Sequence, residues 1–531
     1  MERAVTFSIA LVAMVWAGLG QSTAQVRSLR DGPSISDVAQ QDTLAIASIR
    51  FRGAKAFSEG TLSDAVKANI RAPVTRKRLQ AISDSVTQLY VDNGYFLSKA
   101  VIKPQSFENG IVYLDIVEGY LSGVEINGAA DHPLTSYFTT ALSERPLKRQ
   151  TFERAVTLIN GLPGHRITGR KLDIATADAG AHFLSLEVKR QRVRAQIDAT
   201  NKGVREGEAW RALAGIELVS VLRPGDRLGA GALTRPGAPS ELAYFVARYS
   251  MPIGASGARV FADGVFSDTS PQSALVGRDL EGTLRSFGIG AEYPIIQRRN
   301  ETLNISTRFD WINSRELEND SLLYEDRLRV IRAEAQYAKK LSDTSRTVFE
   351  VRASQGLPSL NASTTVGEFT SRPDADAEFF KIDGSAAVQT YISDRISLTG
   401  SAIGQYTDDT LLFLEEFALG GGSFGRAYDF GEVLGEQGVA GFVEAGYHGK
   451  TNGPIKRWEL YSYADVGAVW NAGAGFSVDG DPLYSAGGGF RVNLFNNVTL
   501  NYEAAYPLAD APFTEDDDSL RHRLQIGVSY P

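Results

Sequence analysis

Cysteine is absent from all 531 residues of the chain, and methionine occurs only three times. A chain without cysteine has no disulfide, no thiolate metal ligand, no cysteine nucleophile and no lipidated N-terminal cysteine. The histidines are also few, and they lack the i, i+4 or HxxxH spacing that zinc sites need. They are His132, His165, His182, His448 and His522. We therefore expect neither a metal nor any other cofactor.

Long hydrophobic runs are missing after the first 24 residues. Those 24 begin with Met1-Glu2-Arg3, continue as an apolar run from Ala4 to Leu19 and end with the small residues Ser22-Thr23-Ala24. This pattern predicts a secretory signal that is cleaved after Ala24. A membrane anchor is the alternative, but about 16 apolar residues fall short of the roughly 20 that a spanning helix needs. The net charge of −8 argues against a nucleic-acid partner.

Helical and strand patterns alternate from residue 43 to residue 190, after a linker or short helix at residues 25–42. Residues 43–120 read as strand, helix, helix, strand, strand, and residues 121–190 repeat this order. In the first repeat the last two strands are expected at Leu97–Ile102 and Ile111–Val117, with Asn109-Gly110 as the turn. The pattern predicts two small α+β domains of βααββ order.

Strand periodicity alone remains from residue 191 to residue 531. In Val498–Tyr506 every second residue is apolar, and Leu303–Trp311 and Leu524–Tyr530 repeat the pattern. Such segments, several of them ending in an aromatic residue, are typical of transmembrane barrels. A soluble β-sandwich would alternate in the same way, but the export signal and the absence of any helical interlude favour a barrel. At about 10 residues per tilted strand, the segment predicts an antiparallel barrel of roughly 16 strands.

Several short motifs resemble those of two-partner secretion transporters, the ShlB/FhaC/HecB haemolysin secretion/activation family of the BamA-like superfamily. Asn93-Gly94-Tyr95 and Val117-Glu118-Gly119 are similar to the first POTRA domain of that family. Arg145-Pro146-Leu147 and Asn160-Gly161-Leu162-Pro163-Gly164 are similar to the second. The resemblance extends over nearly the whole chain after the signal, and it implies two periplasmic POTRA domains before an outer-membrane barrel.

A glycine-rich loop carries the strongest resemblance. Gly420–Tyr428 is similar to the inward-folded loop of the family, which commonly reads VRGY or VRGF, although here Gly425 precedes Arg426 and Ala427 takes the place of the family glycine. Asp465 lies in a stretch similar to the strand whose aspartate pairs with the loop arginine. The resemblance thus implies that Gly425, Arg426, Tyr428, Asp465 and Gly467 join the loop to the barrel wall.

Strand alternation supports this pairing, because Asp465 shares its face with Tyr461, Tyr463 and Gly467. A carboxylate cannot face lipid cheaply, so this face should line the lumen. We expect Arg426 and Asp465 to form a bidentate pair that holds the loop inside the barrel. Chemistry alone favours Arg426 as an ordinary lumen-lining charge in a glycine-rich external loop, and the two matched motifs reverse this preference.

The family resemblance implies a function without catalytic residues: passage of one large unfolded partner protein from the periplasm to the cell surface. The POTRA strands at Leu97–Ile102 and 167–175 could accept an extended client strand at a sheet edge. The candidate client-contacting residues are Leu97, Val101, Ile167, Leu172 and Ile174. Alternatively, these strands only complete the sheets of their own domains. The expected partners are the client and outer-membrane lipid, without nucleotide or nucleic acid.

Two other classes of function share parts of this pattern. BamA-type assembly factors have POTRA domains, the loop arginine and a barrel, but they generally carry more than two POTRA units. A passive porin would lack the periplasmic βααββ units. An outer-membrane enzyme is disfavoured because no Ser-His-Asp/Glu motif stands out in the barrel region. Gly420–Gly425 also satisfies GxGxxG, but it lacks the βαβ context of a dinucleotide site and the GK[ST] of a phosphate loop.

Overall fold

The computed structural model describes residues 45–128, 134–174, 178–201, 210–270, 279–364, 369–472, 482–510 and 519–530. The expected signal at residues 1–24 and the linker or short helix at 25–42 lie outside these ranges. The chain divides into two compact units between Arg190 and Gln191. Within the described ranges, no helix is both long enough and apolar enough to cross a bilayer.

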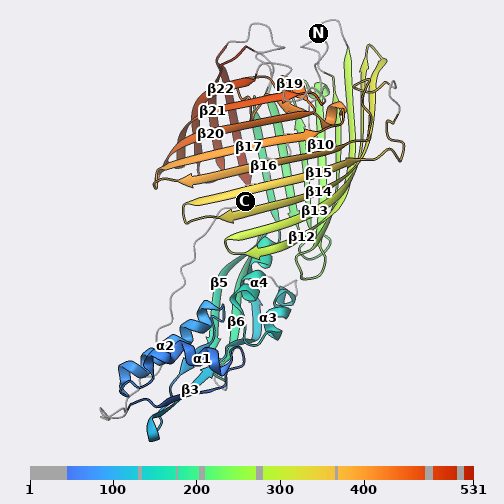
Figure 1. Cartoon of the computed structure of the whole chain (residues 1–531). Coiled ribbons are helices and arrows are strands. Elements are labelled where there is room, and N and C mark those ends of the chain that lie inside the picture. The colour runs from blue at the N-terminus through green and yellow to red at the C-terminus, as the bar shows by residue number, and fades with distance from the viewer. Residues whose placement is uncertain are drawn as a thin grey trace. The chain divides into compact units, whose positions relative to one another are not determined.

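The first unit contains two α+β repeats with the same element order (Figure 1). The elements of the first repeat are β1 (Ser48–Arg52), α1 (Glu59–Val66), η1 (Lys67–Asn69), α2 (Arg76–Asp92), β2 (Lys99–Val101), η2 (Glu108–Gly110) and β3 (Ile111–Val117). Those of the second are β4 (Tyr120–Asn127), η3 (Leu134–Phe138), α3 (Thr139–Ser143), α4 (Arg149–Gly161), β5 (His165–Ile174) and β6 (Ala181–Arg190). The sheet orders are β1-β3-β2 and β4-β6-β5, so β2 and β5 are edge strands.

Each repeat buries its own apolar core between helices and sheet. Leu79, Ile82, Val86 and Tyr90 lie at helical spacing on α2 and pack against the sheet of the first repeat. Thr75 begins this helix, since its side chain accepts a hydrogen bond from the N–H of Arg78 at 3.2 Å. The first helical segment of the second repeat starts at Leu134 as a 3-10 turn and becomes α-helical only at Thr139.

The second unit is a closed barrel, and among the described residues it has sixteen strands, each antiparallel to its neighbours. The predicted α+β plus barrel architecture is thereby confirmed. The barrel strands are β7 (Val193–Thr200), β8 (Arg211–Val219), β9 (Arg227–Thr234), β10 (Leu242–Pro252), β11 (Arg259–Thr269), β12 (Leu280–Arg298), β13 (Glu301–Glu318), β14 (Ser321–Lys340), β15 (Ser345–Gly356), β16 (Phe380–Tyr391), β17 (Ile396–Thr407), β20 (Gln437–Lys450), β21 (Ile455–Trp470), β22 (Leu483–Leu494), β23 (Val498–Pro507) and β24 (Arg521–Tyr530). Figure 1 shows β12 to β17 and β20 to β22 side by side in this wall.

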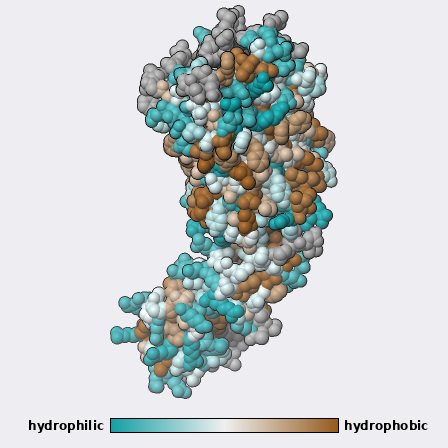
Figure 2. Space-filling view, turned by 90° about the vertical axis from the view of Figure 1, so that its right-hand side faces the viewer, coloured by the Kyte–Doolittle hydropathy of each residue, from teal (hydrophilic) through white to brown (hydrophobic). Residues whose placement is uncertain are grey.

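Alternation gives the barrel wall an apolar outer face and a polar inner face. On β20, outward Val443 is 61% exposed, whereas the next residue, Glu444, is only 8% exposed and faces inward. In the view of Figure 2, hydrophobic residues gather over the middle of the barrel wall and hydrophilic residues over one rim. This distribution is the one that a bilayer requires of a spanning barrel.

Candidate functional site: the inward loop

The connection between β17 and β20, residues 408–436, folds back against the inner wall of the barrel. Here it is called the sixth loop, because it is the sixth of the connections at the rim away from the start of β7. It contains η5 (Phe413–Glu415) and a hairpin of β18 (Phe417–Leu419) and β19 (Val433–Gly435). Leu419, Ala427 and Tyr428 are at most 1% exposed and pack against the inward residues of β20 to β23.

Glycines give the tip of this loop, residues 420–429, its backbone conformation. Gly420, Gly421 and Gly425 have φ values of +101°, +105° and +65°, a region that residues with a side chain rarely adopt. A Cβ atom on Gly420 would lie 1.9 Å from the backbone oxygen of Asp429. Gly420, Gly421 and Gly425 are therefore required by the turn itself.

Asp465 of β21 binds the backbone of the tip. Its Oδ1 accepts from the N–H of Gly425 at 3.2 Å and from Ser485 Oγ at 2.5 Å, and its Oδ2 accepts from the N–H of Arg426 at 3.3 Å. The Asp465 side chain is fully buried, and Arg426 Nε stays 3.9 Å away from Oδ2. Arg426 and Asp465 therefore form the expected ion pair only at long range. The expected bidentate geometry is wrong, because amide and hydroxyl donors occupy the carboxylate.

The Arg426 guanidinium instead joins two glutamates of the inner wall. Its Nη1 lies 3.1 Å from Glu444 Oε2 on β20 and 3.3 Å from Glu503 Oε2 on β23. The rings of Phe442 and Tyr463 lie on its faces, at 4.5 and 4.1 Å from the ring centroids to the guanidinium carbon. The Arg426 side chain is 7% exposed, so the loop inserts a nearly buried cation between two strands of the wall.

Tyr428 and Gly467 complete the contact between tip and wall. Tyr428 Oη lies 2.8 Å from the backbone oxygens of Tyr484 and Ala509. Burial raises the pKa of the Tyr428 hydroxyl above its ordinary value, so it stays protonated and can donate. Gly467 leaves room for the loop, because a Cβ at this position would meet Leu419 Cδ1 at 2.7 Å.

Two arginines of β24 also hold the tip, and sequence reasoning missed both. Arg523 donates to the backbone oxygens of Gly421 at 2.8 Å and Tyr428 at 3.1 Å, and Arg521 forms an ion pair with Asp429. Their inward position on an alternating strand was readable from the sequence, but the partners were not. The wall residues Glu444 and Glu503 were missed for the same reason.

The two POTRA edge strands differ in how accessible they are. On β2, the N–H of Ala100 donates to Thr87 Oγ1 at 3.0 Å, and Ser83 Oγ donates to the Ala100 oxygen at 2.7 Å. Helix α2 therefore closes the free edge of β2, which is also shorter than the expected strand. Leu97 lies before β2, is half-buried and packs against the core of the second repeat. Val101 is half-buried at the end of β2.

The edge of β5 is more open. In the described part of the chain β6 is its only paired strand, and Arg170, Lys171, Asp173 and Ile174 are exposed. Of the expected client-contacting residues on this strand, Ile174 is 51% exposed, whereas Ile167 and Leu172 pack against the core of the repeat. The N–H of Ile167 already donates to Asn160 Oδ1 at 2.9 Å, which closes the first part of the edge.

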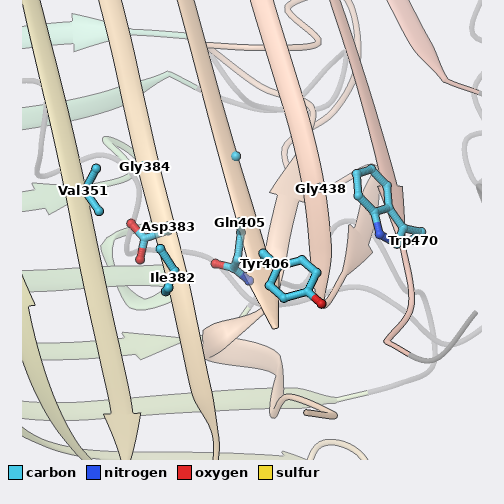
Figure 3. A pocket seen from close by; sticks show the side chains of 9 residues that line it. Val351, Ile382, Asp383, Gly384, Gln405, Tyr406, Gly438 and Trp470 are labelled. Atoms are coloured by element: carbon cyan, nitrogen blue, oxygen red, sulfur yellow. The ribbon is translucent and has the colours of Figure 1, made fainter. Parts of the chain in front are cut away.

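A hollow of about 300 Å³ lies on the outer wall of the barrel (Figure 3). Its lining includes Val351, Ile382, Tyr406 and the glycines Gly384 and Gly404. Val351, Ile382 and Tyr406 are exposed on the outer face of the wall. Gln405 also lines the hollow, although it is buried and its side chain donates to the backbone of the sixth loop. No cluster of metal-ligating side chains occurs within the ranges that the structure describes.

Comparison with known families now adds to this geometry. Residues 184–492 match the family model described as haemolysin secretion/activation protein ShlB/FhaC/HecB, and residues 44–119 match the POTRA domain of ShlB type. The chain belongs to the ShlB/FhaC/HecB family. Members of this family are outer-membrane transporters for partner proteins, so the chain resides in the outer membrane with its POTRA domains in the periplasm.

Individual relatives agree with the family. The chain is 23% identical to the outer membrane transporter CdiB of Escherichia coli O6:K15:H31 over 440 residues, which cover 77% of this chain and 68% of that protein. The solved structure of CdiB from Escherichia coli matches with a TM-score of 0.76 at 18% identity, covering 96% of this chain and 93% of that one. BamA from Haemophilus ducreyi, lacking POTRA domains 1–3, matches with a TM-score of 0.53 at 11% identity, covering 92% and 100%.

Proposed function

We propose that this chain recognises one large unfolded partner protein with its POTRA domains and exports it through the barrel lumen. The observation that carries the proposal is the sixth loop, which lies against the inner wall through Arg426 and its buried wall glutamates. A loop held by many separate polar contacts is a closure that can be displaced and re-formed. No catalytic residue and no nucleotide take part in this scheme, so direction comes from folding of the client outside the cell.

Recognition of the client takes place at the edge of β5, between Arg170 and Ile174. An extended client strand adds to this edge through main-chain hydrogen bonds, and Ile174 offers it an exposed apolar side chain. The edge of β2 takes no part, because Thr87 and Ser83 of α2 already satisfy the backbone of Ala100. This restricts the broader expectation of two client edges to one.

The first test compares the culture supernatant and surface proteome with the outer-membrane proteome, in a strain that lacks the gene and in the complemented strain. We expect one large exported protein to disappear without the gene and to return on complementation, while other barrels remain unchanged. A general fall in outer-membrane barrels would contradict the proposal and indicate an assembly factor of BamA type.

A second test separates the two POTRA edges. A photo-crosslinking residue replaces Lys171 on β5 or, as the matched control, Lys99 on β2, since both lysines are exposed. The client identified by the proteome comparison should form adducts with position 171 and not with position 99. Equal adducts at both positions, or adducts at position 99 alone, would overturn recognition at β5.

A further inference from the structure

A second cluster of buried charges lies at the base of the sixth loop, apart from Arg426 and its partners. The loop supplies three acids, Glu415, Glu416 and Glu436, whose side chains are at most 5% exposed. The cations come from three other places: Arg332 on β14, Lys381 on β16, and Arg372 in the connection between β15 and β16. The described residues of that connection, 357–364 and 369–379, are here called the fifth loop.

Glu415 ties the base to the barrel wall. Its Oε1 lies 2.5 Å from Arg332 Nη2, and its Oε2 lies 2.8 Å from Lys381 Nζ. Burial alone would raise the pKa of the Glu415 carboxyl, but Arg332 and Lys381 outweigh it and hold the pKa at about 2. Glu415 is therefore negatively charged at neutral pH, and it stays bound to both cations.

Arg372 joins the two ends of the β18–β19 hairpin to each other. Its Nη1 lies 2.5 Å from Glu416 Oε1, directly before β18, and it also bonds Glu436 Oε1, directly after β19. Gln405 of β17 contacts both ends of the hairpin from the barrel wall, because its Nε2 donates to the backbone oxygens of Glu415 and Glu436, each at 2.9 Å. One guanidinium from another loop thus closes the base of the β18–β19 hairpin.

Apolar packing joins the two loops further. Ala375, Ala377 and Phe379 of the fifth loop are at most 1% exposed and form one cluster with Leu411 and Leu412 of the sixth loop, which are fully buried. The same cluster includes inward side chains of the wall, namely Leu284, Ile312, Leu328 and Val330. The N–H of Phe413 also donates to Ser371 Oγ at 3.1 Å.

We propose that the fifth and sixth loops form one closure that is displaced as a unit, with Arg372 as the positioning residue that couples them. This inference rests on the proposed function, since it describes how the resting lumen is closed. Removing Arg372 takes a cation away from two buried acids, and buried acids that lose a partner are strongly destabilised. The base should then open in both loops at once, while the barrel wall keeps its own strand pairing.

The absence of native cysteine allows a clean test in the full-length purified protein. Ala375→Cys reports on the fifth loop and Leu412→Cys on the sixth, since both residues are buried. We expect Arg372→Gln to raise the rate of labelling by a bulky maleimide at both reporters together, by about tenfold. Arg372→Lys should restore part of the protection. Arg346→Gln, at an exposed arginine of β15, is the matched control and should change neither rate.

Each outcome bears on the coupling. An increase at only one reporter would overturn it, because the loops would then move separately, and unchanged rates at both would overturn the positioning role of Arg372. Heat-modifiable migration of the barrel on gels shows that each variant is folded. Labelling needs no client, so this test can succeed or fail independently of the proteome comparison that tests export.

Discussion

The tip and the base of the sixth loop are held by different kinds of contact. At the tip, Asp465 accepts from two backbone N–H groups, and Arg523 donates to two backbone oxygens. At the base, Glu415 and Arg372 act through side-chain ion pairs with partners that come from other strands and another loop. The tip therefore depends on its exact backbone conformation as well as on the ion pairs of Arg426, whereas the base depends mainly on the charges that surround it.

Charge swaps at the tip should lower the free energy of unfolding most. Recovery of stability in a double swap, as in a simple ion pair, would contradict the comparison of tip and base. We expect Arg426→Asp and Asp465→Arg each to cost about 3–5 kcal/mol, because each leaves buried partners unsatisfied. The double swap should recover none of this loss, since an aspartate at 426 would face Glu444 and Glu503. Urea titration of the three variants gives the coupling energy, and clear recovery in the double swap would contradict the described geometry. Arg457→Ala, at an exposed arginine, is the control.

Substitutions of glycine test how strongly the tip depends on its backbone conformation. Gly420→Ala forces a side chain into a left-handed conformation at about 1–2 kcal/mol and also into the Asp429 oxygen. Gly422→Ala is the matched control in the same loop, because a Cβ at this position has no atom within 4 Å. Trypsin cleavage within the loop should accelerate in the first variant only. Equal cleavage in both would show that the tip conformation does not hold the loop.

Glu415→Gln tests the base with a change of charge and almost none of shape. We expect a loss of about 1–3 kcal/mol, because Arg332 keeps Asp310 and Lys381 keeps the backbone oxygen of residue 415. The change should increase maleimide labelling of Leu412→Cys. Glu378→Gln, at an exposed glutamate of the fifth loop, should leave labelling unchanged, and an equal effect there would argue against a specific anchor.

Tyr428→Phe should have the smallest effect, since it removes one hydroxyl from a site with several other contacts. The backbone N–H of Ala509 donates to this hydroxyl at 3.2 Å and would lose its partner, at a cost of about 1 kcal/mol. Urea titration alongside the swap variants would place this loss on the same scale. A loss as large as that of Arg426→Asp would mean that the hydroxyl, and not the guanidinium, is the main contact of the tip.

The same contrast explains what could be predicted from the sequence. The two α+β repeats, the barrel strands and the inward face of Asp465 followed from periodicity, which is a local property, and the export signal favoured a barrel over a sandwich. The tip of the sixth loop is recognisable in the sequence as well, because its backbone needs Gly420, Gly421 and Gly425. The base cluster has no such local signal, since Arg332 and Glu415, and likewise Arg372 and Glu436, are far apart in sequence and meet only when the two loops fold against the wall and each other.

Contact partners were the part that sequence reasoning could not supply. Motif resemblance paired Arg426 with Asp465, and alternation turned Asp465 inward, but neither could show that Ser485 and two amides occupy the carboxylate. Nor could it show that α2 covers β2, because the bonds from Ser83 and Thr87 depend on how that helix packs. Motif resemblance identified the right loop and the right strand, and the geometry between them required the structure.

The most direct test of the central claim is the single-channel conductance of purified barrels in planar bilayers, for the native chain, Arg426→Ala, Arg372→Gln and the two combined. If the sixth loop closes the lumen through a tip and a base anchor, each single variant should open more often than the native chain, and the combined variant should open most often and with the largest conductance. A combined variant that conducts like the native chain would contradict the account.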